Sequence, residues 1–88
     1  MARLAVAFQG VFGAFSHEAC LQAAPDHEPT PFDSFEAAFD AVGQGACALG
    51  VFPVENSIAG VVPEVARLLA DGGLSAATFF DRHTVAVR

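Results

Sequence analysis

The sequence predicts an α/β fold of three layers, in which a parallel β-sheet is covered by helices on both faces. The strand-like segments are continuously apolar instead of alternating between apolar and polar residues, which is typical of parallel strands buried on both faces. Helically spaced apolar residues separate them, which gives the order strand, helix, strand, helix, strand, helix, strand. With 88 residues, the chain has room for one small core.

The first half of the expected fold begins with a buried strand over residues 4–8, which ends before Gly10. A helix is expected over residues 16–24, because Pro25 prevents it from continuing. The proline-rich segment that follows favours only a short edge strand around residues 30–32, since proline cannot donate a backbone hydrogen bond to a neighbouring strand.

The second half is expected to contain two more helices and three more strands. Asp33 or Ser34 should cap the second helix, and Gly43 or Gly45 should end it. Its apolar face is formed by Phe35, Ala38, Phe39 and Val42. The third helix has Pro63 in its first turn and a face formed by Val62, Val65, Ala66 and Leu69. The expected strands are residues 46–52, in the centre of the sheet, 74–80 and 84–87.

The charge and hydropathy of the chain disfavour two kinds of partner. The net charge is −6 and all four basic residues are arginines, so the surface would repel a phosphate backbone, and no nucleic-acid partner is expected. No apolar stretch approaches the roughly 20 residues that span a bilayer. No export signal is recognisable near Met1. We therefore expect a cytoplasmic protein with no membrane partner.

The cysteines and histidines do not predict a metal site. Cys20 and Cys47 form no CxxC pair and are expected to be buried thiols in a reducing compartment. The three histidines, His17, His27 and His83, lack the spacing of metal ligands. We expect neither a metal nor a cofactor.

The first candidate site is the turn after the first strand, which reads Gln-Gly-Val-Phe-Gly-Ala-Phe-Ser over residues 9–16. Its two glycines permit a tight turn, and the free N–H groups of the following helix point toward it, which suits an anion or a small molecule. A purely structural strand-to-helix turn would need the same glycines. The GxGxxG pattern and the P-loop GK[ST] are both missing, so a nucleotide is disfavoured.

The second candidate site is the turn after the central strand, over residues 53–60. Three consecutive polar residues, Glu55, Asn56 and Ser57, stand between a buried strand and an amphipathic helix. Helix capping by Asn56 or Ser57 explains one of them. Three in succession favour a binding site.

Together the two turns resemble the paired signature of prephenate dehydratases. In that family, Gln-Gly-x-x-Gly-Ala-[Tyr/Phe]-Ser follows the first strand and Pro-[Ile/Val]-Glu-Asn-Ser-x-x-Gly follows a Gly-Val strand. The second motif appears here as Gly-Val-Phe-Pro-Val-Glu-Asn-Ser-Ile-Ala-Gly over residues 50–60. Between them, residues 34–42 are similar to the family's Ser/Thr-Phe-Glu … Ala-Val helix.

The resemblance implies a fold, an activity and a set of site residues. The fold is the first lobe of a type II periplasmic-binding-protein-like structure, and the activity is the conversion of prephenate to phenylpyruvate in phenylalanine biosynthesis by a homo-oligomer. Residues 1–88 would be a partial catalytic domain, without the second lobe or the regulatory ACT domain. The substrate-binding positions are Gln9, Gly10, Ala14, Phe15, Ser16 and Gly60, and the catalytic ones are Glu55, Asn56 and Ser57.

The chain departs from the family pattern in two respects. Val11 and Phe12 stand where the family usually has an acidic residue and Pro or Ala. The family's Thr-Arg-Phe motif, with its proton-donating threonine and anion-binding arginine, does not occur in the 88 residues. Glu55 is a local alternative as the general acid, and a structural role in anchoring its loop is the other possibility. We expect the 88 residues alone to be inactive and to self-associate.

Two other functions stay open. A solute- or amino-acid-binding lobe of the same architecture needs no catalytic residues, whereas a nucleotide-binding domain is disfavoured by the incomplete glycine pattern. The dehydratase interpretation requires that the turns at residues 9–16 and 55–60 lie side by side at one edge of the sheet.

Overall fold

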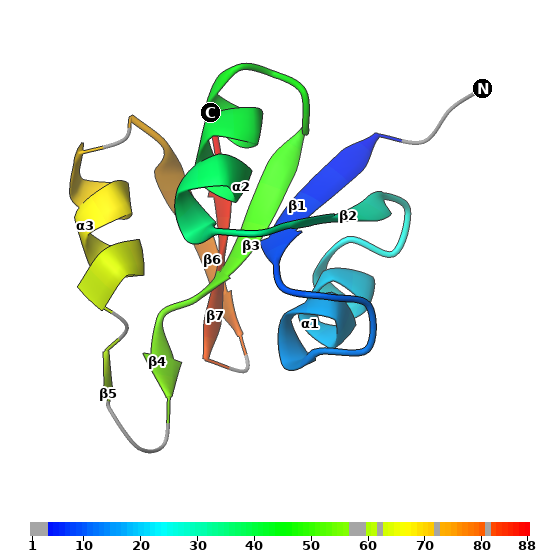
Figure 1. Cartoon of the computed structure of the whole chain (residues 1–88), viewed down its shortest axis with the longest axis horizontal. Helices are drawn as coiled ribbons and strands as arrows, with labels where there is room; N and C mark the ends of the chain where they lie inside the picture. The colour runs from blue at the N-terminus through cyan, green and yellow to red at the C-terminus, as the bar shows by residue number, and fades with distance from the viewer. Residues whose placement is uncertain (1–3, 57–59, 62, 72, 81) are drawn as a thin grey trace.

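The computed structural model describes residues 4–56, 60–61, 63–71, 73–80 and 82–88. Its elements follow the predicted order of strands and helices, with one short additional strand pair after the central strand (Figure 1). They are β1 (Ala5–Gln9), α1 (Phe15–Ala23), β2 (Glu28–Phe32), α2 (Phe35–Gly43), β3 (Leu49–Pro53), β4 (Glu55–Asn56), β5 (Gly60–Val61), α3 (Pro63–Asp71), β6 (Ser75–Phe80) and β7 (His83–Val87).

The main sheet has the strand order β2-β1-β3-β7-β6, with β3 in the centre and β2 at an edge, as expected. β1 is parallel to both β2 and β3. β7 is antiparallel to both of its neighbours, β3 and β6. The α/β fold class is therefore confirmed, but the expectation of an entirely parallel sheet is wrong for β7. Only two residues connect β6 to β7, which is too short for a parallel crossover.

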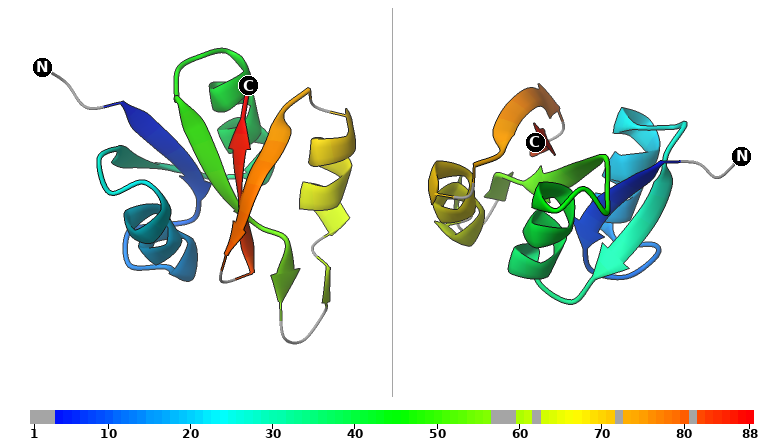
Figure 2. Two further views of the ribbon diagram at one scale, coloured as in Figure 1. Left: turned by 180° about the vertical axis from the view of Figure 1, so that it is seen from behind. Right: turned by 90° about the horizontal axis from the view of Figure 1, so that it is seen from above.

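Helices cover both faces of the sheet, which confirms the three predicted layers (Figure 2). On one face, Ala19, Cys20 and Ala24 of α1 and its C-terminal end pack against Val6, Phe8 and Val51 of the sheet. On the other face, α2 and α3 pack against Ala7, Phe52 and Ala86. Alternate residues of β1 and β3 thus point into different cores, and both strands are buried on both sides.

The second helix forms as the sequence predicts. Ala38, Phe39 and Val42 are buried, and Phe39 packs against Phe52 of β3 with ring centroids 5.3 Å apart. The hydroxyl of Ser34 accepts a hydrogen bond of 3.0 Å from the backbone N–H of Ala37, which caps the start of α2.

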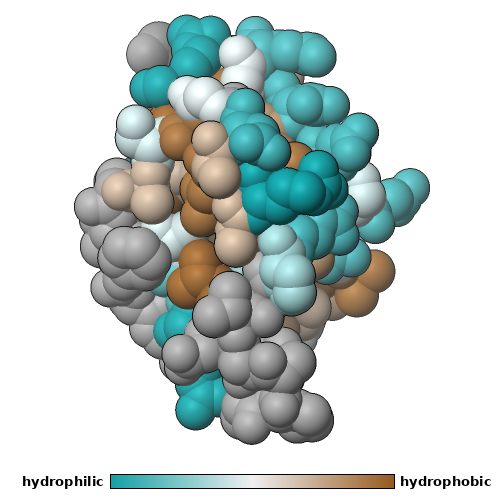
Figure 3. Space-filling model, turned by 90° about the vertical axis from the view of Figure 1, so that its left-hand side faces the viewer, coloured by the Kyte–Doolittle hydropathy of each residue, from teal (hydrophilic) through white to brown (hydrophobic). Residues whose placement is uncertain are grey.

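The third helix begins at Pro63, in agreement with the prediction, and Val65 and Leu69 of its predicted face pack against the core. Val65 is buried and Leu68 and Leu69 pack partly against the core, whereas Ala66, expected to face inward, is exposed. Val62, the other residue of the predicted face, lies outside the described residues. On the side of the molecule formed by α3, hydrophobic residues form a narrow band beside hydrophilic ones (Figure 3).

Candidate functional site

The two predicted turns leave the sheet at the same edge. β1 and β3 are adjacent and parallel, with Ala7 opposite Gly50, so the segments that follow them both start at the carboxyl edge of the sheet. The turn after β1 leads into α1, and the β4–β5 pair follows β3 (Figure 1). Both segments thus start at the same edge, as the dehydratase interpretation requires, but residues 57–59 of the second turn lie outside the described residues.

The first turn depends on glycine at two positions. Gly10 has a φ of 129° and Gly13 a φ of 96°, both in the region that residues with a side chain rarely adopt. The N–H of Gly10 donates a hydrogen bond of 3.0 Å to the carbonyl of Phe32, which ties the turn to the end of β2. The N–H of Ala14 donates to the carbonyl of Val11 at 3.1 Å, which closes the turn on itself.

His17 holds this turn from the first helix. Its Nδ1 atom accepts a hydrogen bond of 2.8 Å from the N–H of Gly13. Its ring stacks on the buried ring of Phe8 and meets the edge of Phe12, with centroids 5.6 Å and 5.1 Å apart. These contacts give His17 a structural role in the turn.

Ser16 lies in the first turn of α1 and contacts a residue from the far end of the chain. Its Oγ atom is 3.1 Å from Nε2 of His83, the first residue of β7. His83 is 7% exposed, whereas Ser16 is partly open to solvent. The hydrogen bond therefore joins the first turn to the start of β7.

The connection between β6 and β7 also contacts the segment that leads to the second turn. The N–H of Val54 donates a hydrogen bond of 2.9 Å to the carbonyl of Arg82. Arg82 is exposed and has a φ of 62°, which is uncommon for a residue with a β-carbon. Through His83 and Arg82, a third chain segment thus joins the two predicted turns, and it brings an arginine to this edge of the sheet.

The structure of the second turn does not support the interpretation that Asn56 caps the third helix. Glu55 and Asn56 form β4, which pairs antiparallel with β5 so that Glu55 is opposite Val61 and Asn56 is opposite Gly60. Because α3 begins only at Pro63, Asn56 does not lie next to the helix start and does not cap this helix. Ser57 lies outside the described residues.

The predicted substrate-binding residues of the first turn differ in their exposure. Gln9, Gly10, Ala14 and Ser16 are half-buried, whereas the ring of Phe15 is 86% exposed. Arg82 and His83 were not predicted as site residues. The signal for them was the short connection, residues 81–83, between two strand-like runs, which is typical of a β-hairpin and places its turn at the carboxyl edge.

The cysteines behave as buried thiols in the structure. Both are free, and Cys20 and Cys47 are 0% and 3% exposed. Burial raises the pKa of Cys20 to about 12 and also raises the pKa of Cys47. Among the described residues, no three His, Cys, Asp or Glu side chains lie close enough together to hold a metal ion.

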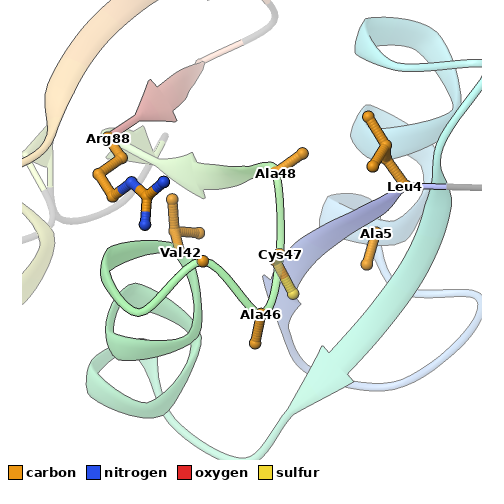
Figure 4. A pocket seen from close by; sticks show the side chains of 8 residues that line it. Leu4, Ala5, Val42, Ala46, Cys47, Ala48 and Arg88 are labelled. Carbon is orange, nitrogen blue, oxygen red and sulfur yellow. The ribbon is translucent and has the colours of Figure 1, made fainter.

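A cavity of about 350 Å³ lies at the opposite edge of the sheet. It is lined by the start of β1, residues 45–48 and Arg88, which follows β7. The guanidinium of Arg88 extends over the end of α2 toward Val42 (Figure 4). The cavity is thus separated from both predicted turns by the length of the strands.

The starts of the two predicted turns and the start of β7 lie at one edge of the sheet, which is the edge where open α/β domains commonly bind their ligands. The prephenate dehydratase family model matches residues 6–80, so it includes both loops and most of the sheet. The chain belongs to the prephenate dehydratase family.

Similar proteins support this assignment. A bifunctional N-acyl-homoserine lactone acylase/prephenate dehydratase of Komagataeibacter europaeus is 42% identical over 69 residues, which are 78% of this chain and 25% of that protein. Arogenate dehydratase/prephenate dehydratase 1, a chloroplastic protein of Arabidopsis thaliana, is 42% identical over 60 residues, 68% of this chain and 15% of that protein.

The structure of prephenate dehydratase from Streptococcus mutans has the same fold. It superposes with a TM-score of 0.87 at 26% identity over 97% of this chain, which corresponds to 48% of that chain. The 88 residues therefore span about half of that enzyme and a quarter or less of the two curated relatives.

In the described part of the chain, no helix is long and apolar enough to cross a membrane.

Proposed function

We propose that this chain supplies one half of the substrate cleft of a prephenate dehydratase, which converts prephenate to phenylpyruvate for the biosynthesis of phenylalanine. The family match across both turns, together with their position at one edge of the sheet, carries the proposal. The second lobe and a regulatory ACT domain belong to other parts of such an enzyme. We propose that the whole enzyme is a cytoplasmic homo-oligomer that needs no cofactor and binds neither nucleic acid nor membrane.

The reaction demands that a dianion be held and that hydroxide leave as water. Prephenate loses carbon dioxide and its ring hydroxyl together, and the formation of an aromatic ring drives both losses. The protein's contribution is to hold the two carboxylates in a productive orientation and to protonate the leaving hydroxyl.

On this half of the cleft, we assign the carboxylates of the substrate to neutral donors. The N–H groups at the start of α1 and the side chains of Ser16, Asn56 and Ser57 are the proposed donors. Gln9, Gly10, Ala14, Phe15 and Gly60 shape the surface between them. Arg82 adds a positive charge at this edge. This charge is in addition to that of the anion-binding arginine, which the family motif places elsewhere in the enzyme.

The proton donor has two candidates. The threonine of the family motif is the first, and it lies outside these 88 residues. Glu55 is the second, because a carboxyl group removed from water has a raised affinity for its proton and can act as a general acid. Its position in β4, at the start of the second turn, is compatible with either catalysis or anchoring of the turn.

Alanine variants of Asn56 and Ser57 in the full-length protein test the proposal. Each should lower the turnover of prephenate by about tenfold or more, because a donor aimed at the substrate is lost. Formation of phenylpyruvate is followed by its absorbance in alkali. Ser75→Ala is the matched control, since Ser75 is exposed and lies at the opposite edge of the sheet. Unchanged kinetics in both site variants would remove the assignment.

A binding lobe without catalysis is the alternative within the same architecture. It is distinguished by adding prephenate, phenylpyruvate or free amino acids to the isotope-labelled protein and following its amide resonances. Binding of amino acids without turnover of prephenate supports the alternative. Comparison of prephenate with arogenate, which the Arabidopsis relative's name also mentions, determines the preferred substrate.

Amide hydrolysis is a second candidate function, favoured by one contact. The Komagataeibacter relative is named as an acylase as well as a dehydratase. A histidine nitrogen 3.1 Å from a serine hydroxyl is an arrangement that can activate the serine as a nucleophile. Incubation with an N-acyl-homoserine lactone, followed by mass spectrometry, would detect an acyl group on Ser16, and its absence together with a lack of released fatty acid rejects this candidate.

A further inference from the structure

The contact between Ser16 and His83 joins segments that lie 67 residues apart in the sequence. Ser16 belongs to the first turn of α1, directly after the first predicted loop. His83 is the first residue of β7 and lies opposite Pro53, the last residue of β3. The side chain of His83 therefore reaches the first loop from the base of the second one.

His83 and Ser16 differ in how far they are buried, and this difference limits the role of each residue. His83 is 7% exposed, so its ring lies beneath the surface of this edge. Ser16 is partly exposed and its Oγ atom is 3.1 Å from Nε2 of His83. A ligand at this edge can therefore reach Ser16 more easily than His83.

A serine in the first turn of a helix has several competing orientations. Its hydroxyl can rotate among staggered positions, and it can bond to backbone groups of its own helix. A hydrogen bond of 3.1 Å to Nε2 of His83 selects the orientation in which Oγ points toward β7. A side chain that is already oriented loses less entropy when a ligand binds, and it holds that ligand in a more uniform geometry.

We infer that His83 is a positioning residue of the proposed substrate cleft, which orients the hydroxyl of Ser16 toward a carboxylate or hydroxyl group of the substrate. The inference rests on the proposed dehydratase function. It assigns a role to a residue of β7 that neither candidate turn contains. Because His83 acts through Ser16, removing either side chain should have the same consequence as removing both.

A double-mutant cycle in the full-length protein tests this inference. Ser16→Ala and His83→Leu should each lower kcat/KM for prephenate by about tenfold, and the double variant should lower it by no more than either single change. His83→Gln, which can place an amide group near the position of Nε2, should recover most of the loss in the presence of Ser16 and none in its absence.

The controls separate a positioning role from a general loss of structure. His27→Gln changes a histidine that lies between α1 and β2, at the opposite edge of the sheet, and should leave kcat/KM unchanged. Thermal unfolding of every variant identifies those that fail to fold. If His83→Leu unfolds, the comparison of His83→Gln with and without Ser16 carries the same test.

Two results would overturn the inference. Both can be distinguished from the result that would remove the proposed function. Independent, multiplicative effects of the Ser16 and His83 changes would show that His83 does not act through Ser16. An acyl group found on Ser16 during turnover of an amide would make His83 a base and not a positioning residue. A folded wild-type protein that neither binds nor converts prephenate would remove the proposed function itself, and the inference with it.

Discussion

The thiol of Cys20 lies among the apolar side chains that join α1 to the sheet, including those of Val6 and Phe8. Burial disfavours the charged thiolate and raises the pKa of Cys20 from its ordinary value of 9.0 to about 12. The unfolded chain, in which the thiol meets water, ionises at the ordinary value. Between these two pKa values the folded protein binds more protons than the unfolded one, so stability falls as the pH rises.

We therefore expect the free energy of unfolding to decrease above pH 9, with a contribution from Cys20 of roughly 1 kcal/mol at pH 10. Urea unfolding at pH 8 and pH 10 measures it. Cys20→Ala should show a smaller decrease over this interval, although the variant is less stable at pH 8 because it loses buried volume. An identical decrease in both proteins would contradict the assignment of this pH dependence to Cys20.

Individual site residues could be predicted from the sequence where the pattern is local. Gln9 and Ser16 flank a glycine-containing turn after an apolar run, and the left-handed φ values of Gly10 and Gly13 explain why the pattern has glycine there. His83 could not be recognised in this way. Its contact with Ser16 depends on the antiparallel direction of β7, for which the signal is the short connection after β6 and not a motif around His83.

At the scale of single elements, the central strand β3 is limited by the space around Gly50. A β-carbon at this position would lie 2.5 Å from the ring of Phe52 and 3.1 Å from Cγ2 of Val42. Phe52 is fully buried and packs against Phe39, so its ring has little room to move. The glycine therefore permits α2 to pack closely on the strand.

Gly50→Ala should destabilise the protein by about 1–3 kcal/mol, because overpacking forces the Phe52 ring or the backbone to shift. Urea unfolding followed by circular dichroism measures the change. Gly43→Ala is the matched control: its added methyl group meets nothing within 4 Å, and alanine is the better residue in a helix, so its stability should be equal or slightly higher. A Gly50→Ala protein as stable as the wild type would show that the core can rearrange without cost.

The elements themselves could be predicted to different degrees. α2 combines regular apolar spacing with a capping serine, so both its existence and its buried face were predicted correctly. The direction of β7 was not, since the composition of an apolar run does not depend on its direction and only the short connection before β7 indicates a hairpin. The position of α3 and the inward placement of Val65 and Leu69 were correct, but that of Ala66 was not, because alanine is apolar enough to fit the pattern and small enough to be exposed.

At the scale of the whole molecule, the candidate site is bordered by exposed apolar side chains. Val11, Phe12 and Phe15 are 70%, 62% and 86% exposed, and all three belong to the first turn or the helix start after it. Scattered exposed apolar residues are ordinary, but three within five positions of one turn are a concentration of apolar surface. In the proposed enzyme, the rest of the cleft lies over this edge.

The 88 residues expressed by themselves should therefore self-associate and show no measurable dehydratase activity. Water reaches the open half-cleft, and neither the motif arginine nor the motif threonine is present to act on the substrate. Sedimentation velocity measures the first property and a prephenate assay the second. A monomer at all concentrations would contradict the expected association, and turnover by the isolated chain would contradict the need for a second half.

The placement of β7 has a consequence for synthesis on the ribosome. β6 contacts the rest of the main sheet only through β7, which lies between it and β3. While residues 83–87 are still inside the exit tunnel, β6 has emerged without a strand to pair with. This sheet can therefore close only when β7 inserts between β3 and β6, which are already made, and loss of residues 83–87 would detach β6 from the sheet.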